Sequence, residues 1–262
     1  MRRLLIACLV ALVAIPAHAA ETVLTLTARP GASFRVLTDR PARPVGSVIL
    51  LAGGSGVLDL GDDGRIGGLS QNHLVRTRKA YVRAGYAIFV PDMAGDIRNA
   101  SAYRFGAAHA TDLAAVVAAA RAVGGPVFVI GTSRGSVSVV ALFTRQTGPL
   151  PDGVVISSGT LMDNGRMRGA ASAGDLGRIR VPVLLLRHES DSCAASSPRD
   201  ADRFKASLTG ARSVEIVTFS GGGPQSAKAD PCGPQHYHGF LGIEDQVVAR
   251  TVAWMGANAK AR

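Results

Sequence analysis

The sequence has few cysteines and few aromatic residues: it contains 3 cysteines, and 5% of its residues are Phe, Trp or Tyr. Its Lys and Arg residues are scattered, with no basic run and no aromatic residues interleaved with basic ones, so a nucleic-acid-binding surface is not indicated. It also has no internal repeat, no low-complexity segment and, beyond its N-terminus, no apolar run long enough to span a bilayer. We therefore expect a globular protein with no transmembrane segment in the mature chain.

The N-terminus has the pattern of a secretory signal peptide. Two arginines precede a short apolar run, and the sequence Ala-His-Ala at 17–19 fits a signal-peptidase cleavage site. We predict that residues 1–19 are a Sec-type signal peptide, cleaved after Ala19 or Ala20. Residues 20–262 are then expected to form one domain, in the periplasm or outside the cell.

Two cysteines, Cys193 and Cys232, remain in the predicted mature chain. In an exported protein two cysteines most simply form one disulfide. Cys193 lies two residues after Asp191 and Cys232 six residues before His238, so this bridge would join the segments that carry them. A metal cluster formed with His236 and His238 is the alternative, but its spacing matches no standard zinc pattern. We predict a disulfide, no metal and no cofactor.

Apolar runs and helical patterns alternate through most of the chain. The later apolar runs are continuous, which is typical of parallel strands covered on both faces. Strands are predicted at 22–27, 34–38, 46–53, 86–92, 127–131, 153–158, 181–188 and 213–219. Helices are predicted from an N-cap at Ser70 to Gly85, at 107–123, after Ser133, at 199–209 and at 243–257. This order predicts a doubly wound, mostly parallel α/β sheet with a short N-terminal antiparallel β segment.

The segment between the predicted strands at 153–158 and 181–188 indicates how open the site is. Residues 159–180 are rich in Gly, Ala and Asp, and they are too few for a separate lid domain. We expect a loop with about one helical turn and a fairly open site.

One serine lies at a predicted strand-to-helix boundary. In Gly131-Thr-Ser133-Arg-Gly135 an apolar run halts at the first glycine, and helical spacing resumes after the second. A nucleophile on such a turn needs a strained backbone, and flanking glycines let the strand and the helix approach closely. Ser133 is therefore the candidate nucleophile, whereas Ser136 and Ser138 are expected to be packing or surface residues.

A serine hydroxyl needs a base that is itself oriented by a carboxylate. The acid is expected after the penultimate strand, where Asp191 lies, and the base is expected in front of the last helix, where His238 lies. Glu189 and Asp200 are expected to be surface charges. His236 is expected to line the site and is the alternative base.

With these motifs, the chain resembles the α/β-hydrolase family across its mature length. The resemblance lies in the Gly-Thr-Ser-Arg-Gly turn, the acid in His-Glu-Ser-Asp, and the His-Gly-Phe before the last helix. It implies an oxyanion hole with one backbone N–H from Arg134 and one from the loop after Ala52. Gly54 is the expected second donor, with Ser55 as the alternative. Many family members have His-Gly at the start of this loop, where this chain has Ala52-Gly53.

Together these features predict an exported serine hydrolase that cleaves a small ester through an acyl-enzyme on Ser133. Amide and lactone hydrolysis use the same groups and stay open as alternatives. Arg134 and His236 are also candidates to contact an acidic substrate group. A second hypothesis is a binding or scaffold protein that keeps the fold without turnover. A third is attraction of the basic chain, of formal net charge +10, to an anionic envelope surface.

Overall fold

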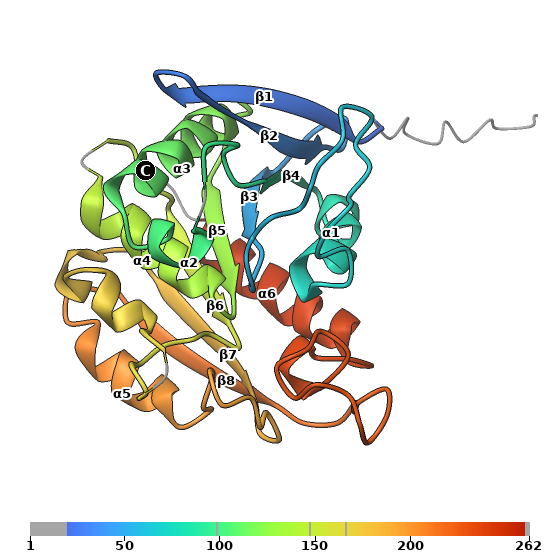
Figure 1. Ribbon diagram of the computed structural model, residues 1–262, viewed down its shortest axis with the longest axis vertical. Coiled ribbons are helices and arrows are strands. Elements are labelled where there is room, and N and C mark those ends of the chain that lie inside the picture. The colour runs from blue at the N-terminus through green and yellow to red at the C-terminus, as the bar shows by residue number, and fades with distance from the viewer. Residues whose placement is uncertain (1–19, 98, 147, 166, 260–262) are drawn as a thin grey trace, which may run out of the picture.

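The structure is a computed structural model that describes residues 20–97, 99–146, 148–165 and 167–259 (Figure 1). The predicted signal peptide, residues 1–19, lies outside the described residues. In the described ranges, every helix is too short or too polar to cross a membrane.

An eight-stranded sheet forms the centre of the molecule (Figure 1). Its strands are β1 (Thr22–Arg29), β2 (Ala32–Asp39), β3 (Gly46–Leu51), β4 (Tyr86–Pro91), β5 (Val127–Thr132), β6 (Gly153–Ser157), β7 (Val183–His188) and β8 (Val214–Phe219). The spatial order is β1-β2-β4-β3-β5-β6-β7-β8. Pairing is antiparallel for β1 with β2 and for β2 with β4, and parallel for the other neighbours. The predicted fold class, including the N-terminal antiparallel segment, is confirmed.

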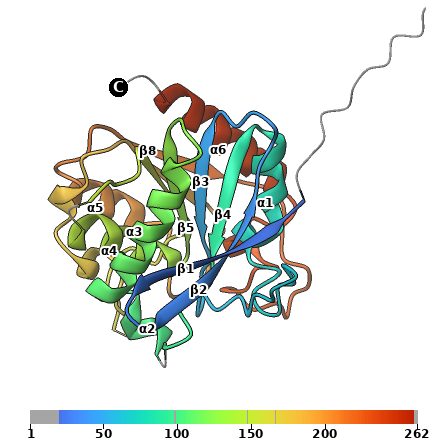
Figure 2. The ribbon, with the colours of Figure 1, turned by 90° about the horizontal axis from the view of Figure 1, so that it is seen from above.

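Helices cover both faces of the sheet (Figure 2). They are α1 (His73–Arg83), α2 (Ala100–Tyr103), α3 (Ala107–Arg121), α4 (Gly135–Arg145), α5 (Asp200–Ser207) and α6 (Glu244–Asn258), with 3₁₀ turns η1 (Ala170–Ala173), η2 (Leu176–Arg178) and η3 (Tyr237–Gly239). Side chains of α3, α4 and α5 pack in one apolar core, and those of α1 and α6 pack in the other.

Strand β5 shows why the apolar runs of the sequence are continuous. Val129 belongs to the core under α3 and α4, whereas Phe128 and Ile130 belong to the core under α1 and α6. All three side chains are buried, because successive side chains of a strand point to opposite faces and helices cover both. Polar and apolar residues do not alternate along β5, because helices cover both faces of the strand.

Two local features differ from the sequence prediction. The expected N-cap at Ser70 is wrong: α1 begins at His73, and the Asn72 side chain accepts a hydrogen bond from the Leu74 N–H at 3.2 Å. Asn is as good an N-cap as Ser, and Asn72 lies only two residues after Ser70 in the same polar run. The short helix α2 was not predicted, because four residues are too few for a periodic pattern.

The segment between β6 and β7 contains only the two short turns η1 and η2 among its described residues. This agrees with the expectation of a loop without a large lid domain.

The central packing gives a stability prediction. Phe128 is fully buried, and its ring packs edge-on against Tyr86 at 6.4 Å and Trp254 at 6.1 Å between centroids. Phe128→Ala should lower the free energy of unfolding by about 3–5 kcal/mol, measured by urea denaturation followed by circular dichroism. Val45→Ala, at a side chain that is 59% exposed, should change it by less than about 0.5 kcal/mol. Equal losses in the two variants would contradict this packing.

Candidate active site

Ser133 lies on the sharp turn between β5 and α4, and its backbone has φ 51°, in the left-handed region. This conformation is costly for a residue with a side chain. The neighbouring glycines explain how the turn fits. A Cβ on Gly131 would lie 2.6 Å from the Gly135 carbonyl oxygen, and one on Gly135 would lie 2.3 Å from the Leu51 carbonyl oxygen. The strand and the helix therefore approach as closely as the sequence pattern predicts.

Hydrogen bonds on both sides hold the Ser133 backbone in this conformation. Its N–H donates to the Ser157 carbonyl at 3.0 Å, at the end of β6. Its carbonyl accepts from the Thr160 N–H at 3.1 Å and from the Ser136 hydroxyl at 2.7 Å. Ser136 is thus a buried packing residue, as expected, and it also stabilises the turn.

Asp191 and His238 come from different loops and meet in a buried hydrogen bond. His238 Nδ1 lies 2.9 Å from Asp191 Oδ2, and their side chains are 6% and 2% exposed. The other carboxylate oxygen of Asp191 accepts from the Cys193 N–H at 3.0 Å. With Nδ1 bonded to the carboxylate, the opposite nitrogen, Nε2, is available to exchange a proton.

A disulfide joins the two loops that carry this pair. Cys193 follows β7 and Cys232 precedes η3, and their sulfur atoms are bonded across a sequence separation of 39 residues. Closing a loop of this length contributes about 4 kcal/mol in the chain-entropy account. The predicted disulfide is therefore present, and it restrains the loops on either side of the Asp191–His238 contact.

Arg76 of α1 provides a second restraint on the His238 segment. Its guanidinium donates to the Gly239 carbonyl at 2.6 Å, to the Gln71 carbonyl at 2.6 Å and to the Glu244 carboxylate at 2.8 Å. The residue after His238 is therefore connected to α1 and to the start of α6. The sequence offered no signal for this contact, because 168 residues separate Arg76 from Glu244.

Ser133 and His238 line one pocket that is open to solvent. Its other lining residues include Gly53, Gly54, Leu69, Gln71, Asn72, His73, Cys232 and Pro234. Ser133 Oγ and His238 Nε2 form no hydrogen bond in the described part of the chain, and Nε2 is buried without a partner there. Such contacts are often long in unliganded enzymes and shorten when substrate binds.

His73 also lines the pocket, which was not predicted from the sequence. It opens α1, is 2% exposed, and its ring packs 5.2 Å from that of Phe240. Burial lowers the pKa of His73 to about 3, so its ring is neutral at physiological pH. Its position directly after the loop that follows β3 was the available signal.

The loop after β3 lies against the nucleophile turn. A Cβ on Gly53 would lie 2.9 Å from Ser133 Cβ, and Gly54 lines the same pocket. Neither the Gly54 N–H nor the Arg134 N–H donates a hydrogen bond to any other described residue. Both expected oxyanion donors are therefore available for a bound group.

The side chains of the remaining candidates do not line this pocket. Glu189 is exposed, and Asp200 starts α5, where it lies 3.8 Å from Arg203. His236 does not line the pocket with Ser133 and instead packs against Tyr237, with 5.1 Å between ring centroids. This contradicts the expectation that His236 lines the site. Arg134 is half-buried, and burial lowers the pKa of its guanidinium.

Comparison with solved structures identifies the fold. An esterase from Pyrococcus furiosus is similar, with TM-score 0.65 and 12% identity over 91% of each chain. A dienelactone hydrolase from Anabaena variabilis has TM-score 0.62 and 14% identity over 91% of this chain and 97% of its own. A fungal esterase from Rhizomucor miehei has TM-score 0.63 and 15% identity over 95% of this chain and 85% of its own. No protein-family model and no curated protein sequence matches this chain. The chain therefore has the α/β-hydrolase fold, shared with esterases and a dienelactone hydrolase at low identity.

The disulfide gives a prediction that two measurements can check. Iodoacetamide should leave Cys193 and Cys232 unmodified in the unreduced protein. After reduction under denaturing conditions, both thiols should be alkylated, and the intact mass should rise by two adducts. The Cys193→Ser/Cys232→Ser double variant should lose about 4 kcal/mol of stability in urea. Alkylation of both cysteines in the folded, unreduced protein would show that the bridge is absent.

Proposed function

We propose that this protein is an exported serine hydrolase that cleaves carboxylic esters. The observation that carries the proposal is that His238, which is hydrogen-bonded to the buried Asp191, lines the same pocket as Ser133. A serine on a positive-φ strand-to-helix turn, beside an imidazole bonded to a carboxylate, is the arrangement that activates a hydroxyl nucleophile.

Ser133, His238 and Asp191 act in two successive half-reactions of the proposed mechanism. Ser133 Oγ attacks the ester carbonyl carbon while its proton passes to His238 Nε2, and Asp191 stabilises the resulting imidazolium. Collapse of the tetrahedral intermediate breaks the bond to the alcohol, which leaves with the proton from His238. Water then attacks the acyl-enzyme, again with His238 as base, and releases the acid and free Ser133.

The negative charge that develops on the carbonyl oxygen needs donors that are already in place. The backbone N–H groups of Gly54 and Arg134 are the proposed donors, since both are without a partner among the described residues. Arg134 directly follows Ser133 in the turn, and Gly54 lines the same pocket as Ser133. Donors fixed before the reaction stabilise the intermediate without reorganisation in the transition state.

Esters are the proposed substrate class, with lactones and amides as alternatives for the same groups. The fold is shared with esterases and with a dienelactone hydrolase, which supports ester and lactone chemistry. Export is supported by the Cys193–Cys232 disulfide, because such bonds persist in oxidising compartments. The signal-like residues 1–19 point to the same location.

Covalent labelling tests the nucleophile directly. A fluorophosphonate probe should add once to the folded protein by intact mass, and Ser133→Ala should remove the adduct. His238→Ala should slow labelling by at least about 100-fold, because the hydroxyl loses its base. His236→Ala and Ser207→Ala, which change a histidine and a serine outside the pocket, should label at the rate of the wild type.

Two results would contradict the proposal. Labelling of the Ser133→Ala protein at the normal rate would place the reactive serine elsewhere. A folded wild-type protein that gains no adduct and turns over no small ester would favour the binding or scaffold function that the fold also permits.

The carboxylate gives a separate prediction. Asp191→Asn should lower kcat for a p-nitrophenyl ester by about 10⁴-fold with little change in KM, because the amide cannot stabilise the imidazolium or select its tautomer. Glu189→Gln, two residues away and exposed, is the matched control and should leave kcat unchanged. Equal kcat values for the two variants would exclude Asp191 from the proposed role.

A further inference from the structure

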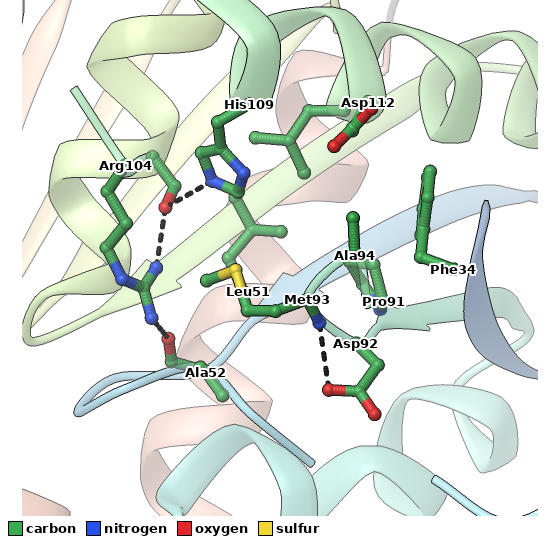
Figure 3. Close-up of a pocket in the computed structure, with 13 residues that line it drawn as sticks. Phe34, Leu51, Ala52, Pro91, Asp92, Met93, Ala94, Arg104, His109 and Asp112 are labelled. Carbon is green, nitrogen blue, oxygen red and sulfur yellow. Dashed lines mark hydrogen bonds between the residues drawn. The ribbon is translucent and has the colours of Figure 1, made fainter. Parts of the chain in front are cut away.

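Arg104 is a fully buried arginine that holds the loop after β3. It follows α2 and is 1% exposed. Its Nη2 donates to the Ala52 carbonyl at 2.9 Å (Figure 3). It also makes longer contacts of 3.4 Å to the Gly53 and Gly54 carbonyls. One guanidinium nitrogen therefore meets three consecutive carbonyl oxygens of the loop that carries the proposed oxyanion donor.

This cation has no carboxylate partner in the described part of the chain. The two acidic side chains that line the same cavity bind other groups: Asp92 accepts from the Leu58 and Leu60 N–H groups, and Asp112 accepts from Arg29. Burial lowers the pKa of Arg104 to about 9, so it remains a cation at neutral pH. Carbonyl dipoles therefore replace the counter-ion that a buried charge ordinarily needs.

The other end of the guanidinium is anchored on two helices. Arg104 Nη1 donates to Ser138 Oγ of α4 at 2.6 Å, and His109 Nε2 of α3 lies 2.8 Å from the same oxygen. Burial lowers the pKa of His109 to about 3, so its ring is neutral. All three side chains are buried, and Figure 3 shows Arg104 extended between His109 and Ala52. Loop movement at Gly54 would therefore disturb contacts with both helices.

Peptide geometry connects these carbonyls to the other side of the loop. In a trans peptide the C=O and the following N–H point in opposite directions. The Gly53 carbonyl is held toward Arg104 and also accepts from the Gly56 N–H at 3.0 Å. The N–H of Gly54, which belongs to the same peptide, must therefore point away from Arg104.

The loop is also shaped around the guanidinium. Gly56 has φ 77°, and a Cβ there would lie 2.4 Å from Arg104 Nη2. A side chain at this position would displace the guanidinium from the carbonyls. The arginine and the glycine-rich loop therefore fit each other closely.

We propose that Arg104 is a positioning residue for the oxyanion hole, holding the carbonyls of Ala52 to Gly54 so that the Gly54 N–H faces the oxygen of the tetrahedral intermediate. Its positive charge also polarises these peptide groups and makes the amide a stronger donor in this buried setting. The inference rests on the proposed hydrolase function and adds a residue that takes no part in proton transfer and touches no substrate.

The test compares two arginine variants of the full chain. Arg104→Met should lower kcat for p-nitrophenyl acetate by about 100-fold or more, the effect of losing one oxyanion donor, while KM changes less than about threefold. Affinity for a trifluoromethyl ketone, which forms the same oxyanion, should fall in parallel. Arg121→Met removes an arginine that bonds to Asp152 and to the Leu150 carbonyl, and it should leave kcat unchanged.

Two further variants distinguish a positioning role of Arg104 from a general folding defect. Arg104→Lys keeps the charge but contacts fewer carbonyls, so its kcat should lie between those of Arg104→Met and the wild type. Ser138→Ala removes the Nη1 acceptor, leaves the carbonyl contacts, and should cost about tenfold in kcat. The proposal would be overturned if Arg104→Met and Arg121→Met lost kcat equally and these losses followed the decrease in melting temperature. A folded Arg104→Met protein with the kcat of the wild type would also overturn it.

Hydrogen exchange tests whether Arg104 anchors the loop, independently of the proposed hydrolase activity. The amides of residues 52–60 should exchange at least about tenfold faster in Arg104→Met than in wild type or Arg121→Met. Unchanged exchange would overturn the anchoring by Arg104 whatever the activity. A wild-type protein without turnover or adduct would overturn the hydrolase function alone, and faster exchange in Arg104→Met would then still support the anchoring.

Discussion

The left-handed backbone of Ser133 is the constraint on which the rest of the site depends. A non-glycine residue keeps a positive φ only where its surroundings hold it there. Here the parallel register of β5 and β6 pairs Thr132 with Ser157, which brings the Ser157 carbonyl to the Ser133 N–H. The helix that follows can start at once because Gly135 lacks a Cβ against the Leu51 carbonyl. The strained turn therefore depends on the neighbouring strands β3, β5 and β6 and on α4.

The proposed partners of Ser133 are positioned by a different kind of constraint. Asp191 and His238 lie in loops after β7 and β8, and loops are the least restrained parts of a fold. The covalent Cys193–Cys232 bond and the contacts of Arg76 with the segment after His238 compensate for this freedom. Although the described residues between β6 and β7 form no large lid, these contacts therefore restrain the loops that line the pocket.

The sequence predicted the sheet well because its signal is local. Each central strand is a short apolar run buried on both faces, and the order of runs and helices determines the topology once crossovers are right-handed. The triad candidates could be chosen because they follow particular strands. The N-cap of α1, by contrast, was wrong, since Ser70 and Asn72 offer the same capping chemistry. His73 and Arg104 were missed because burial of a polar side chain depends on contacts more than 30 residues away, which no local pattern records.

Arg104 shows why such long-range burial matters for the proposed chemistry. Leaving a guanidinium inside a protein without a carboxylate costs several kcal/mol, and the cost falls only if other dipoles replace the lost water. Both acidic groups of its cavity are engaged elsewhere, so the carbonyls of the loop after β3 are the dipoles that solvate this cation. Those carbonyls cannot rotate away without exposing a buried charge to an apolar surrounding. The desolvated arginine therefore makes the orientation of the peptide between Gly53 and Gly54 a condition of folding, which fixes the N–H of the proposed oxyanion donor in the unliganded protein.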